Sequence, residues 1–361
     1  MSTFACRGFT LVELMIASAI GITLVAAALS LFGQGRAVAR VNETVARIQE
    51  QGRYALSTIE ADAEIAGFYG FTNWPAAIRL VSGGNPDSVV ATAAQMTQAS
   101  IAAAGVPASA QACGVNFAVD VLTPVQGSNG MFTLGRSRTA ACAPYGSGAA
   151  AGADTLTLRH ADTRDAAAEA GRIQLLASRL SSRTAQYLFA DGNAPGGVDS
   201  NHRLLNLVVR TYYIARDSVS RPGFPALRVK ALSRSGGSAV FDEDEVITGI
   251  EDLQVQFGID TGDRDNDGRI DADADADGDG LPDASGRVTR YVPADFPDLG
   301  RYPVLAVRVW LRVRADEPET GYVDGRTYRY ADVVYTPSGA DAAYRRVVVT
   351  RTIAVRNARL Y

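Results

Sequence analysis

Near its N-terminus the chain carries one long apolar run, LVELMIASAIGITLVAAALSLF, which extends from Leu11 to Phe32. As an α-helix rising about 1.5 Å per residue, this run is long enough to cross the roughly 30 Å hydrocarbon core of a bilayer. A single carboxylate, Glu13, interrupts it. An acid inside a membrane span is costly, although a position near one end of the span lowers that cost. Glu13 is therefore a candidate functional residue.

The segment before the apolar run is short and polar, and it ends in Arg7-Gly8 followed directly by Phe9. It lacks the regions of an ordinary secretory signal peptide, and no A-x-A-type site closes the run. A plain signal anchor with an incidental acid is one interpretation. However, the order Gly8-Phe9-Thr10-Leu11-Val12-Glu13 resembles the class III signal peptide of type IV pilins and their relatives. We therefore favour a pilin-type signal.

This resemblance implies three properties of the N-terminus. Prepilin peptidase would remove a leader, residues 1–8, by cutting between Gly8 and Phe9. Phe9 would then be N-methylated. Glu13 would pair with the Phe9 amine of a neighbouring subunit during assembly, as a charge pair across an apolar interface.

A helical pattern continues beyond the apolar run. Apolar residues recur mostly at spacings of three, four and seven, at Val41, Val45, Ile48, Ala55, Leu56 and Ile59. The sequence predicts one helix over residues 9–66, with its membrane-spanning part at about 11–32 and a weak point at Gly52. Gly67 and Gly70 are expected to end it. The change from apolar all round to amphipathic indicates a membrane part followed by a part packed on a globular domain.

The remaining residues, 67–361, are expected to form a globular, β-rich domain. Residues 67–150 are rich in Ala, Gly, Ser, Pro and Asn, so loops with short strands or helices are expected there. Strand-like patterns then follow at 155–158, 204–214, 250–257, 307–314 and 347–355. Period-two alternation joined by turn-rich connections predicts a mostly antiparallel sheet. One long helix and such a sheet give the α+β class, with a pilin-like arrangement.

Several later segments extend the resemblance to PilW-type minor pilins. They are GRYALSTIEADAEIAGFYGF (52–71), GADTLTLRHAD (152–162), TGIEDLQVQFGID (248–260), VLAVRVWLRVR (304–314) and YRRVVVTRTIAVRN (344–357). One departure is a missing cysteine soon after the helix, where Phe71 stands.

The PilW resemblance implies a non-catalytic minor pilin that primes assembly of a type IV pilus and lies at or near its tip. It implies these partners: other minor pilins and the major pilin, prepilin peptidase, the inner-membrane assembly platform and a tip adhesin. The chain would begin in the inner membrane with its globular domain in the periplasm, and would end in the extracellular pilus.

Cysteine usage fits a compartment outside the cytoplasm. Cys6 falls in the predicted leader, which leaves Cys113 and Cys142. A disulfide between them would close a loop of about 30 residues and contribute roughly 3–4 kcal/mol in the chain-entropy model. The alternative is two buried free thiols.

An acidic segment at residues 260–283 stands out in a chain whose net charge is only −4, because it holds ten Asp against Arg264 and Arg269. Its D-x-D-x-D-G spacing is typical of calcium loops, in which alternate carboxylates and one backbone carbonyl point at the ion. Two registers fit this pattern. The first contains Asp263, Asp265, Asp267, Arg269 through its carbonyl, and Asp271. The second contains Asp275, Asp277, Asp279, Leu281 through its carbonyl, and Asp283.

We expect the loop to hold one or two calcium ions. Ala274 and Gly286 occupy the twelfth positions, where an EF-hand has a bidentate Glu, so that ligand is either missing or supplied from elsewhere, by Asp273 or Asp260. Without flanking helices, a structural staple is expected rather than a sensor. The alternative is a solvated acidic loop, which its own charge repulsion would disorder.

No catalytic constellation is visible in the sequence. His160 and His202 are the only histidines, in unrelated contexts. Arg308, Arg312 and Arg314 share one strand face, for which a solvated face with ion pairs is favoured over nucleic-acid binding. Two alternatives to a pilus protein remain: a minor pseudopilin of a type II secretion system, and a calcium-dependent adhesin or DNA-binding tip module.

Overall fold

The structure is a computed structural model that describes residues 10–72, 74–134, 142–180, 186–262, 285–297 and 299–358. The chain divides into two compact units, Met1–Arg47 and Ile48–Tyr361, each of which is described by itself. The helix α1 covers Leu11–Ala63. Its residues in the first unit include the apolar run, whose large side chains are exposed from Leu11 to Phe32. By length and composition α1 could cross a membrane.

The second unit is built mainly of strands. The strands are β1 (Arg79–Val81), β2 (Val89–Thr92), β3 (Val125–Ser128), β4 (Thr155–Asp165), β5 (Gln174–Ser178), β6 (Gln186–Phe189), β7 (His202–Ala215), β8 (Ala226–Ser235), β9 (Ser238–Thr248), β10 (Ile250–Ile259), β11 (Arg290–Pro293), β12 (Val304–Arg314), β13 (Tyr328–Tyr330), β14 (Val333–Tyr335) and β15 (Arg346–Ala354). The short helices are α2 (Gln98–Ala103) and the 3₁₀ turns η1 (Pro75–Ala77), η2 (Ala93–Gln95), η3 (Ala108–Gln111), η5 (Leu299–Arg301) and η6 (Gly339–Ala343).

The described strands form two main sheets and a small hairpin. The first sheet has the order β2-β1-β6-β5-β7-β4-β3, and β8 pairs with both β7 and β9. The second has the order β11-β10-β12-β15, while β13 pairs only with β14. Only β1 and β6 run parallel among these pairs. The α+β class with a long N-terminal helix and a mostly antiparallel sheet is thus confirmed.

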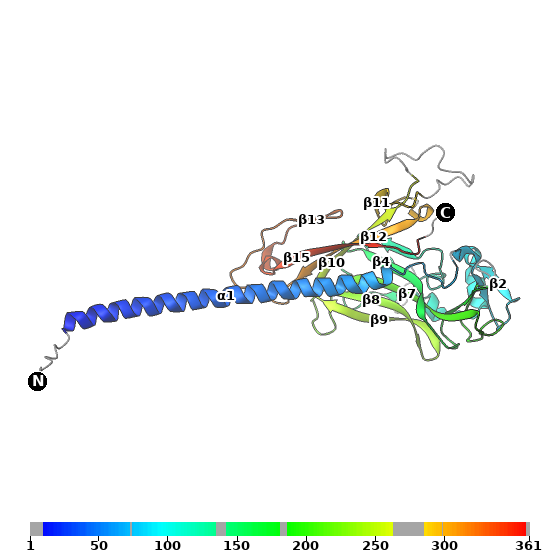
Figure 1. Ribbon diagram of the computed structural model, residues 1–361, viewed down its shortest axis with the longest axis horizontal. Coiled ribbons are helices and arrows are strands. Elements are labelled where there is room, and N and C mark those ends of the chain that lie inside the picture. The colour runs from blue at the N-terminus through cyan, green and yellow to red at the C-terminus, as the bar shows by residue number, and fades with distance from the viewer. Residues whose placement is uncertain are drawn as a thin grey trace, which may run out of the picture. The chain divides into compact units, whose positions relative to one another are not determined.

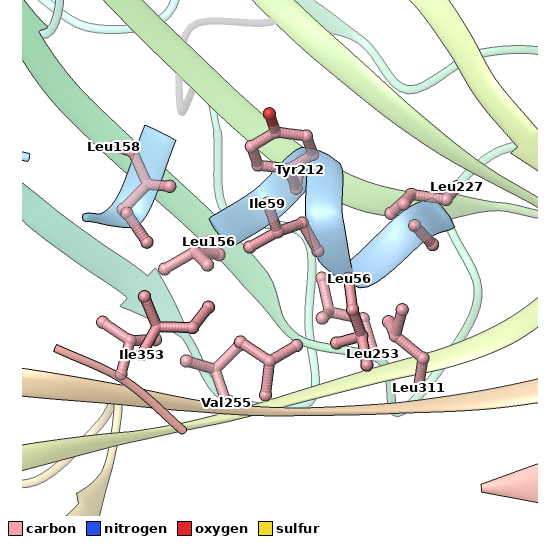
Figure 2. Packing of buried hydrophobic residues seen from close by; sticks show 14 of the residues in the cluster. Leu56, Ile59, Leu156, Leu158, Tyr212, Leu227, Leu253, Val255, Leu311 and Ile353 are labelled. Atoms are coloured by element: carbon pink, nitrogen blue, oxygen red, sulfur yellow. The ribbon is translucent and has the colours of Figure 1, made fainter. Parts of the chain in front are cut away.

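The last turns of α1 lie between the two sheets (Figure 1). In Figure 2, Leu56 and Ile59 of α1 face apolar side chains of both sheets. Those labelled there are Leu156, Leu158, Tyr212 and Leu227 of the first sheet and Leu253, Val255, Leu311 and Ile353 of the second. Burying one such side chain stabilises a fold by roughly 1.5–3 kcal/mol. Because the amphipathic half of α1 buries several of them, it contributes substantially to the stability of this core.

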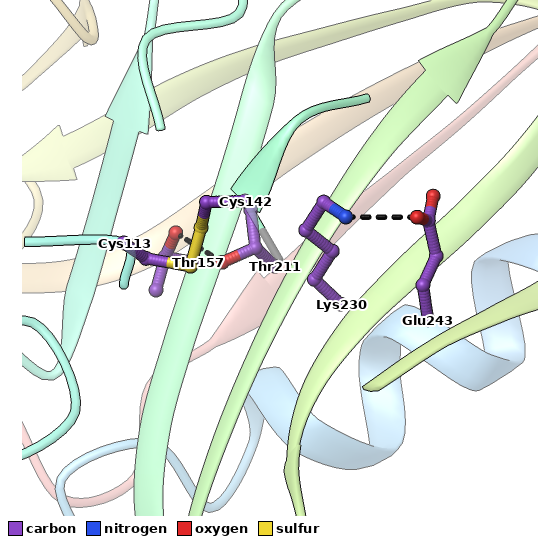
Figure 3. Close-up of a disulfide and its surroundings, with 6 residues drawn as sticks. All are labelled: Cys113, Cys142, Thr157, Thr211, Lys230 and Glu243. Atoms are coloured by element: carbon purple, nitrogen blue, oxygen red, sulfur yellow. Dashed lines mark hydrogen bonds and ion pairs between the residues drawn. A yellow bond between two sulfur atoms is a disulfide. The ribbon is translucent and has the colours of Figure 1, made fainter. Parts of the chain in front are cut away.

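The opposite face of the first sheet carries a second core, which the segment around α2 and η3 covers. Cys113 and Cys142 lie in it and form a disulfide with a Cα–Cα distance of 5.2 Å, so the expectation of paired rather than free cysteines is confirmed. Beside the disulfide, a row of polar side chains crosses four adjacent strands (Figure 3). The row consists of Thr157, Thr211, Lys230 and Glu243. Lys230, the only lysine of the chain, is buried, and its Nζ lies 2.8 Å from Glu243 Oε2.

The β8–β9 hairpin was not among the predicted strands. Its turn contains Gly236 and Gly237, which both have positive φ, at 57° and 80°. Two adjacent glycines between apolar stretches are a recognised hairpin signal because such turns need left-handed residues. The dipeptide could therefore have indicated this hairpin.

Candidate functional site

Glu13 lies in the first turn of α1 and forms a reciprocal cap with Thr10. The Thr10 backbone N–H and hydroxyl donate to Glu13 Oε2 at 2.9 and 3.0 Å, and the Glu13 N–H donates to Thr10 Oγ1 at 3.3 Å. Such a T-x-x-E capping box satisfies N–H groups that lack partners within the helix, and an acid there also complements the helix dipole. Sequence reasoning missed this local function of Glu13, which the spacing alone could have shown.

The rest of this end of α1 is a mainly apolar surface without further charged residues. Its residues from Leu11 to Phe32 are exposed on every side of the helix. A helix that is apolar all round needs lipid or other apolar helices around it. The capped carboxylate of Glu13 is therefore the one ionisable group on a surface suited to helix association.

The other end of α1 is held to the first sheet by a buried polar cluster. Asp62 receives a contact from Arg210 Nη1 at 2.6 Å and a hydrogen bond from the Tyr212 hydroxyl at 2.5 Å. The His160 Nε2 atom lies 3.6 Å from the same carboxylate, and His160 Nδ1 lies 2.8 Å from the Ala161 carbonyl oxygen. Burial favours a raised pKa for Asp62, but its contacts with these three neighbours outweigh burial and lower the pKa.

Two further ion pairs connect α1 and the turn after it to the C-terminal segment. Arg351 of β15 pairs with Glu60, and Arg356 Nη2 lies 3.1 Å from Glu64 Oε1. The histidines both have structural surroundings, since His202 Nδ1 lies 2.6 Å from Asp199. Neither histidine is next to a nucleophile in these contacts.

The arginine face of β12 differs from the solvated face that the sequence suggested. Arg308 stacks over the Tyr291 ring with 3.6 Å to its centroid. Arg312 and Arg314 are largely buried and approach Glu251 at 3.0 and 3.5 Å. The correction has a physical reason: the segment from 315 to 345 folds back over this face, and its aromatic rings cover the guanidinium groups.

Arg346 completes this network from β15. It is fully buried, makes two contacts with Glu251 at 2.8 and 2.9 Å, and lies 2.6 Å from Asp341. Buried charges of this kind need partners, and here the carboxylates supply them. Arg312, Arg314 and Arg346 therefore stabilise the second sheet through buried ion pairs and do not form a free basic surface.

The predicted processing residues Gly8 and Phe9 lie outside the described residues. The same holds for all predicted calcium ligands, namely Asp263, Asp265, Asp267, Arg269, Asp271, Asp275, Asp277, Asp279, Leu281 and Asp283, and for Asp273. Within the described ranges no group of three or more His, Cys, Asp or Glu side chains suits a metal ion.

Asp260, which we considered as an extra ligand, is described and buried at the end of β10. Its carboxylate accepts hydrogen bonds from the Gly262 and Gly286 N–H groups at 3.0 and 2.7 Å and from the Ser285 hydroxyl at 2.8 Å. Next to Asp260, the hydroxyl groups of Thr261 and Thr289 form a hydrogen bond with 2.9 Å between their Oγ1 atoms. We call these contacts, which join the two sides of the acidic segment, the Asp260 neck. Asp260 therefore closes the base of the acidic segment.

Comparison with protein families gives two matches at the two ends of the chain. Residues 4–29 match the prokaryotic N-terminal methylation motif, and residues 211–357 match the type IV pilus-assembly protein W family, PilW. Together these matches support a PilW-type minor pilin. The PilW region begins within β7 and ends just after β15, so it includes the whole second sheet and the β8–β9 hairpin.

Among solved structures, the pilin is similar to a type IV-like pilin from Thermus thermophilus, with 11% sequence identity. The match covers 57% of this chain and 79% of that chain, with a TM-score of 0.25. Because this score is low, the fold described above rests on the helix and strands themselves. No curated protein matches this chain.

Proposed function

We propose that this PilW-type pilin is a non-catalytic minor pilin that primes type IV pilus assembly at or near the pilus tip. The observation that carries the proposal is the exposed apolar end of α1 with Glu13 in its first turn, ahead of a PilW region. Other minor pilins, the major pilin and a tip adhesin would be its neighbours. Prepilin peptidase would cleave it, and the inner-membrane assembly platform would add it to the pilus.

The proposed mechanism is packing of helices. After cleavage between Gly8 and Phe9, the apolar end of α1 would leave lipid and join a bundle of similar helices. Glu13 would then meet the methylated Phe9 amine of a neighbour and fix the axial register. The capping box is compatible with this, because Thr10 donates both of its hydrogen bonds to Oε2 and leaves Oε1 for a cation.

In this proposal the globular unit starts in the periplasm and ends outside the cell. A minor pseudopilin of a secretion system would share the leader and the helix, but the PilW match favours the pilus. Deletion of the gene separates the two: lost piliation and twitching support a pilus protein, and lost exoprotein secretion supports a pseudopilin. Direct adhesion or DNA binding by a soluble fragment starting near Ala37 would instead support a tip-binding module.

The function is tested by Glu13→Ala. Removing a charge from the span should leave membrane insertion intact or ease it, whereas incorporation into pili should fall severely because the Phe9 amine loses its partner. Glu43→Ala, an exposed acid on the same helix, is the matched control and should assemble normally. Immunoblots of sheared pili and of membranes measure both properties. Normal incorporation of the Glu13 variant would refute the pairing.

The same cells test processing. N-terminal sequencing of the mature protein should begin at N-methyl-Phe9, and a bulky residue in place of Gly8 should block cleavage. An intact Met1, or a cut beyond Phe32, would contradict a pilin-type signal.

We also propose that the acidic segment binds one or two calcium ions as a structural staple. The support is the spacing of its aspartates and carbonyl donors, together with the Asp260 neck that brings the segment's two ends together. Calcium would neutralise carboxylates that otherwise repel one another.

A further inference from the structure

Two arginines follow the apolar run of α1 on one face of the helix. Arg36 and Arg40 lie four and eight residues beyond Phe32, and both are exposed. Residues four apart share a helical face, where two like charges destabilise each other. No carboxylate among the described residues pairs with either one, and the nearest acid on this helix, Glu43, lies 4.0 Å from Arg47 instead. An external anion would relieve the repulsion.

The position of the pair along the helix indicates which anion this is. At about 1.5 Å per residue, Arg36 lies roughly 6 Å and Arg40 roughly 12 Å beyond the apolar run. The polar headgroup layer of a bilayer extends about 5–7 Å beyond the hydrocarbon core on each side, so Arg36 lies within this layer. Arg40 lies just outside it, from where a long side chain can reach back to it. The Arg36 guanidinium points back toward the apolar run, because it lies 4.4 Å from the centroid of the Phe32 ring. This is the direction in which a basic side chain reaches an interface from a helix end.

The charge distribution around the span makes these arginines unusual. Basic residues normally flank a span on its cytoplasmic side. Among residues 1–10 one basic side chain, Arg7, precedes the span, whereas Arg36, Arg40 and Arg47 follow it. In the orientation of our proposed function the later arginines lie outside the cytoplasm, where they oppose the usual bias. The positive charge after the span therefore has a function other than orienting the helix in the membrane.

We propose that Arg36 and Arg40 clamp the phosphate of an anionic phospholipid headgroup and so hold the pilin in the membrane before assembly. Guanidinium groups suit this partner because their planar donors bind phosphate oxygens in pairs. The inference rests on the proposed function for its membrane orientation. In that orientation the clamp holds the helix in the membrane until the assembly platform provides the energy to extract it.

The test uses the full-length chain in lipid nanodiscs and counts retained lipids by native mass spectrometry. In phosphatidylglycerol nanodiscs, Arg36→Gln/Arg40→Gln should retain the anionic lipid roughly thirtyfold more weakly, since each arginine near an anionic surface contributes about fivefold. In phosphatidylcholine nanodiscs the two proteins should behave alike. Millimolar inorganic phosphate should not displace the phosphatidylglycerol, which distinguishes a headgroup site from a free phosphate site.

The control variant is Arg47→Gln/Arg53→Gln, which removes the same charge from exposed positions farther along the helix. It should stay within twofold of the native chain. Equal retention by all three proteins would overturn the clamp, and so would equal loss in both variants. An Arg36→Gln/Arg40→Gln protein that keeps its lipid but fails to enter pili would assign these arginines to a neighbouring subunit. If the native chain retains the anionic lipid but does not enter pili, the result contradicts the proposed pilus function and leaves the lipid clamp intact.

Discussion

Gly52 shows how one residue fixes the approach of α1 to the second sheet. A Cβ atom added to Gly52 would lie 2.9 Å from a methyl group of Val349 and 3.2 Å from one of Val313. Glycine inside a helix costs about 1 kcal/mol relative to alanine. The sequence marked the residue as a weak point of the helix. In the structure, close packing compensates for this cost in helix stability, because only glycine lets α1 lie this close to β12 and β15.

We expect Gly52→Ala to destabilise the protein by about 1–2 kcal/mol. Overpacking costs roughly 1–3 kcal/mol, and the better helix propensity of alanine returns less than that. Chemical denaturation of a soluble fragment starting near Ala37 measures the change. Adding Val349→Ala should couple favourably with Gly52→Ala, because it removes the methyl groups that the new Cβ meets. Purely additive effects, or a more stable single variant, would exclude the close contact.

At the scale of elements, the end of α1 is attached to β4 and β7 through Asp62. Its side chain is only 5% exposed, whereas that of Arg210 is 43% exposed, so solvent screens part of this pair. The pKa of Asp62 is lowered in the folded protein. A carboxyl with a lowered pKa stabilises the fold above its unfolded pKa of about 3.9, and this contribution is lost as the pH falls through the folded pKa.

Asp62→Asn should therefore lower stability near neutral pH by about 2–3 kcal/mol, since it leaves buried polar groups with a weaker partner. The loss should begin to shrink below about pH 4, where the Asp62 carboxylate of the unfolded chain becomes protonated. It should shrink further as the pH falls through the lower pKa of folded Asp62. Urea denaturation between pH 3 and pH 7 measures both effects. Asp165→Asn is the control, because Asp165 is 69% exposed in its pair with Arg203 and should change stability little. A pH-independent loss would show that charge at Asp62 is unimportant.

On the scale of the whole molecule, the β-rich unit surrounds one helix with two sheets, and its second sheet lies entirely within the PilW match. The proposed calcium segment connects β10 to β11 of that sheet in the sequence, and Asp260 stands at its start. An ion bound only by the folded state would stabilise the unit by mass action.

In the soluble fragment starting near Ala37, calcium at a hundredfold its Kd should add about 2.7 kcal/mol of stability and raise the melting temperature above that in chelator. Asp265→Ala with Asp277→Ala should abolish the difference, whereas Asp87→Ala, outside the segment, should leave it unchanged. Magnesium should substitute poorly because it demands tighter octahedral geometry. Identical melting curves in millimolar calcium and in chelator would return the segment to a solvated acidic loop.

Local patterns in the sequence predicted the long helix and the longest strands of this protein, although not the β8–β9 hairpin. The apolar run and its change to an amphipathic pattern predicted α1, and alternation predicted the buried valines and leucine of β12 at Val307, Val309, Leu311 and Val313. The order of residues around Gly8 and Glu13 indicated the pilin class. These features are readable because helix and strand periods involve neighbours a few residues apart.

Only the tertiary structure decided which distant residues meet. Asp62 and Arg210 are 148 positions apart, and Glu251 and Arg346 are 95 apart. No local period carries such pairings, so the sequence alone could suggest a solvated arginine face on β12. In the fold, the segment from 315 to 345 covers that face. The energetic reason is that a charged group leaves water only when folding brings it a partner.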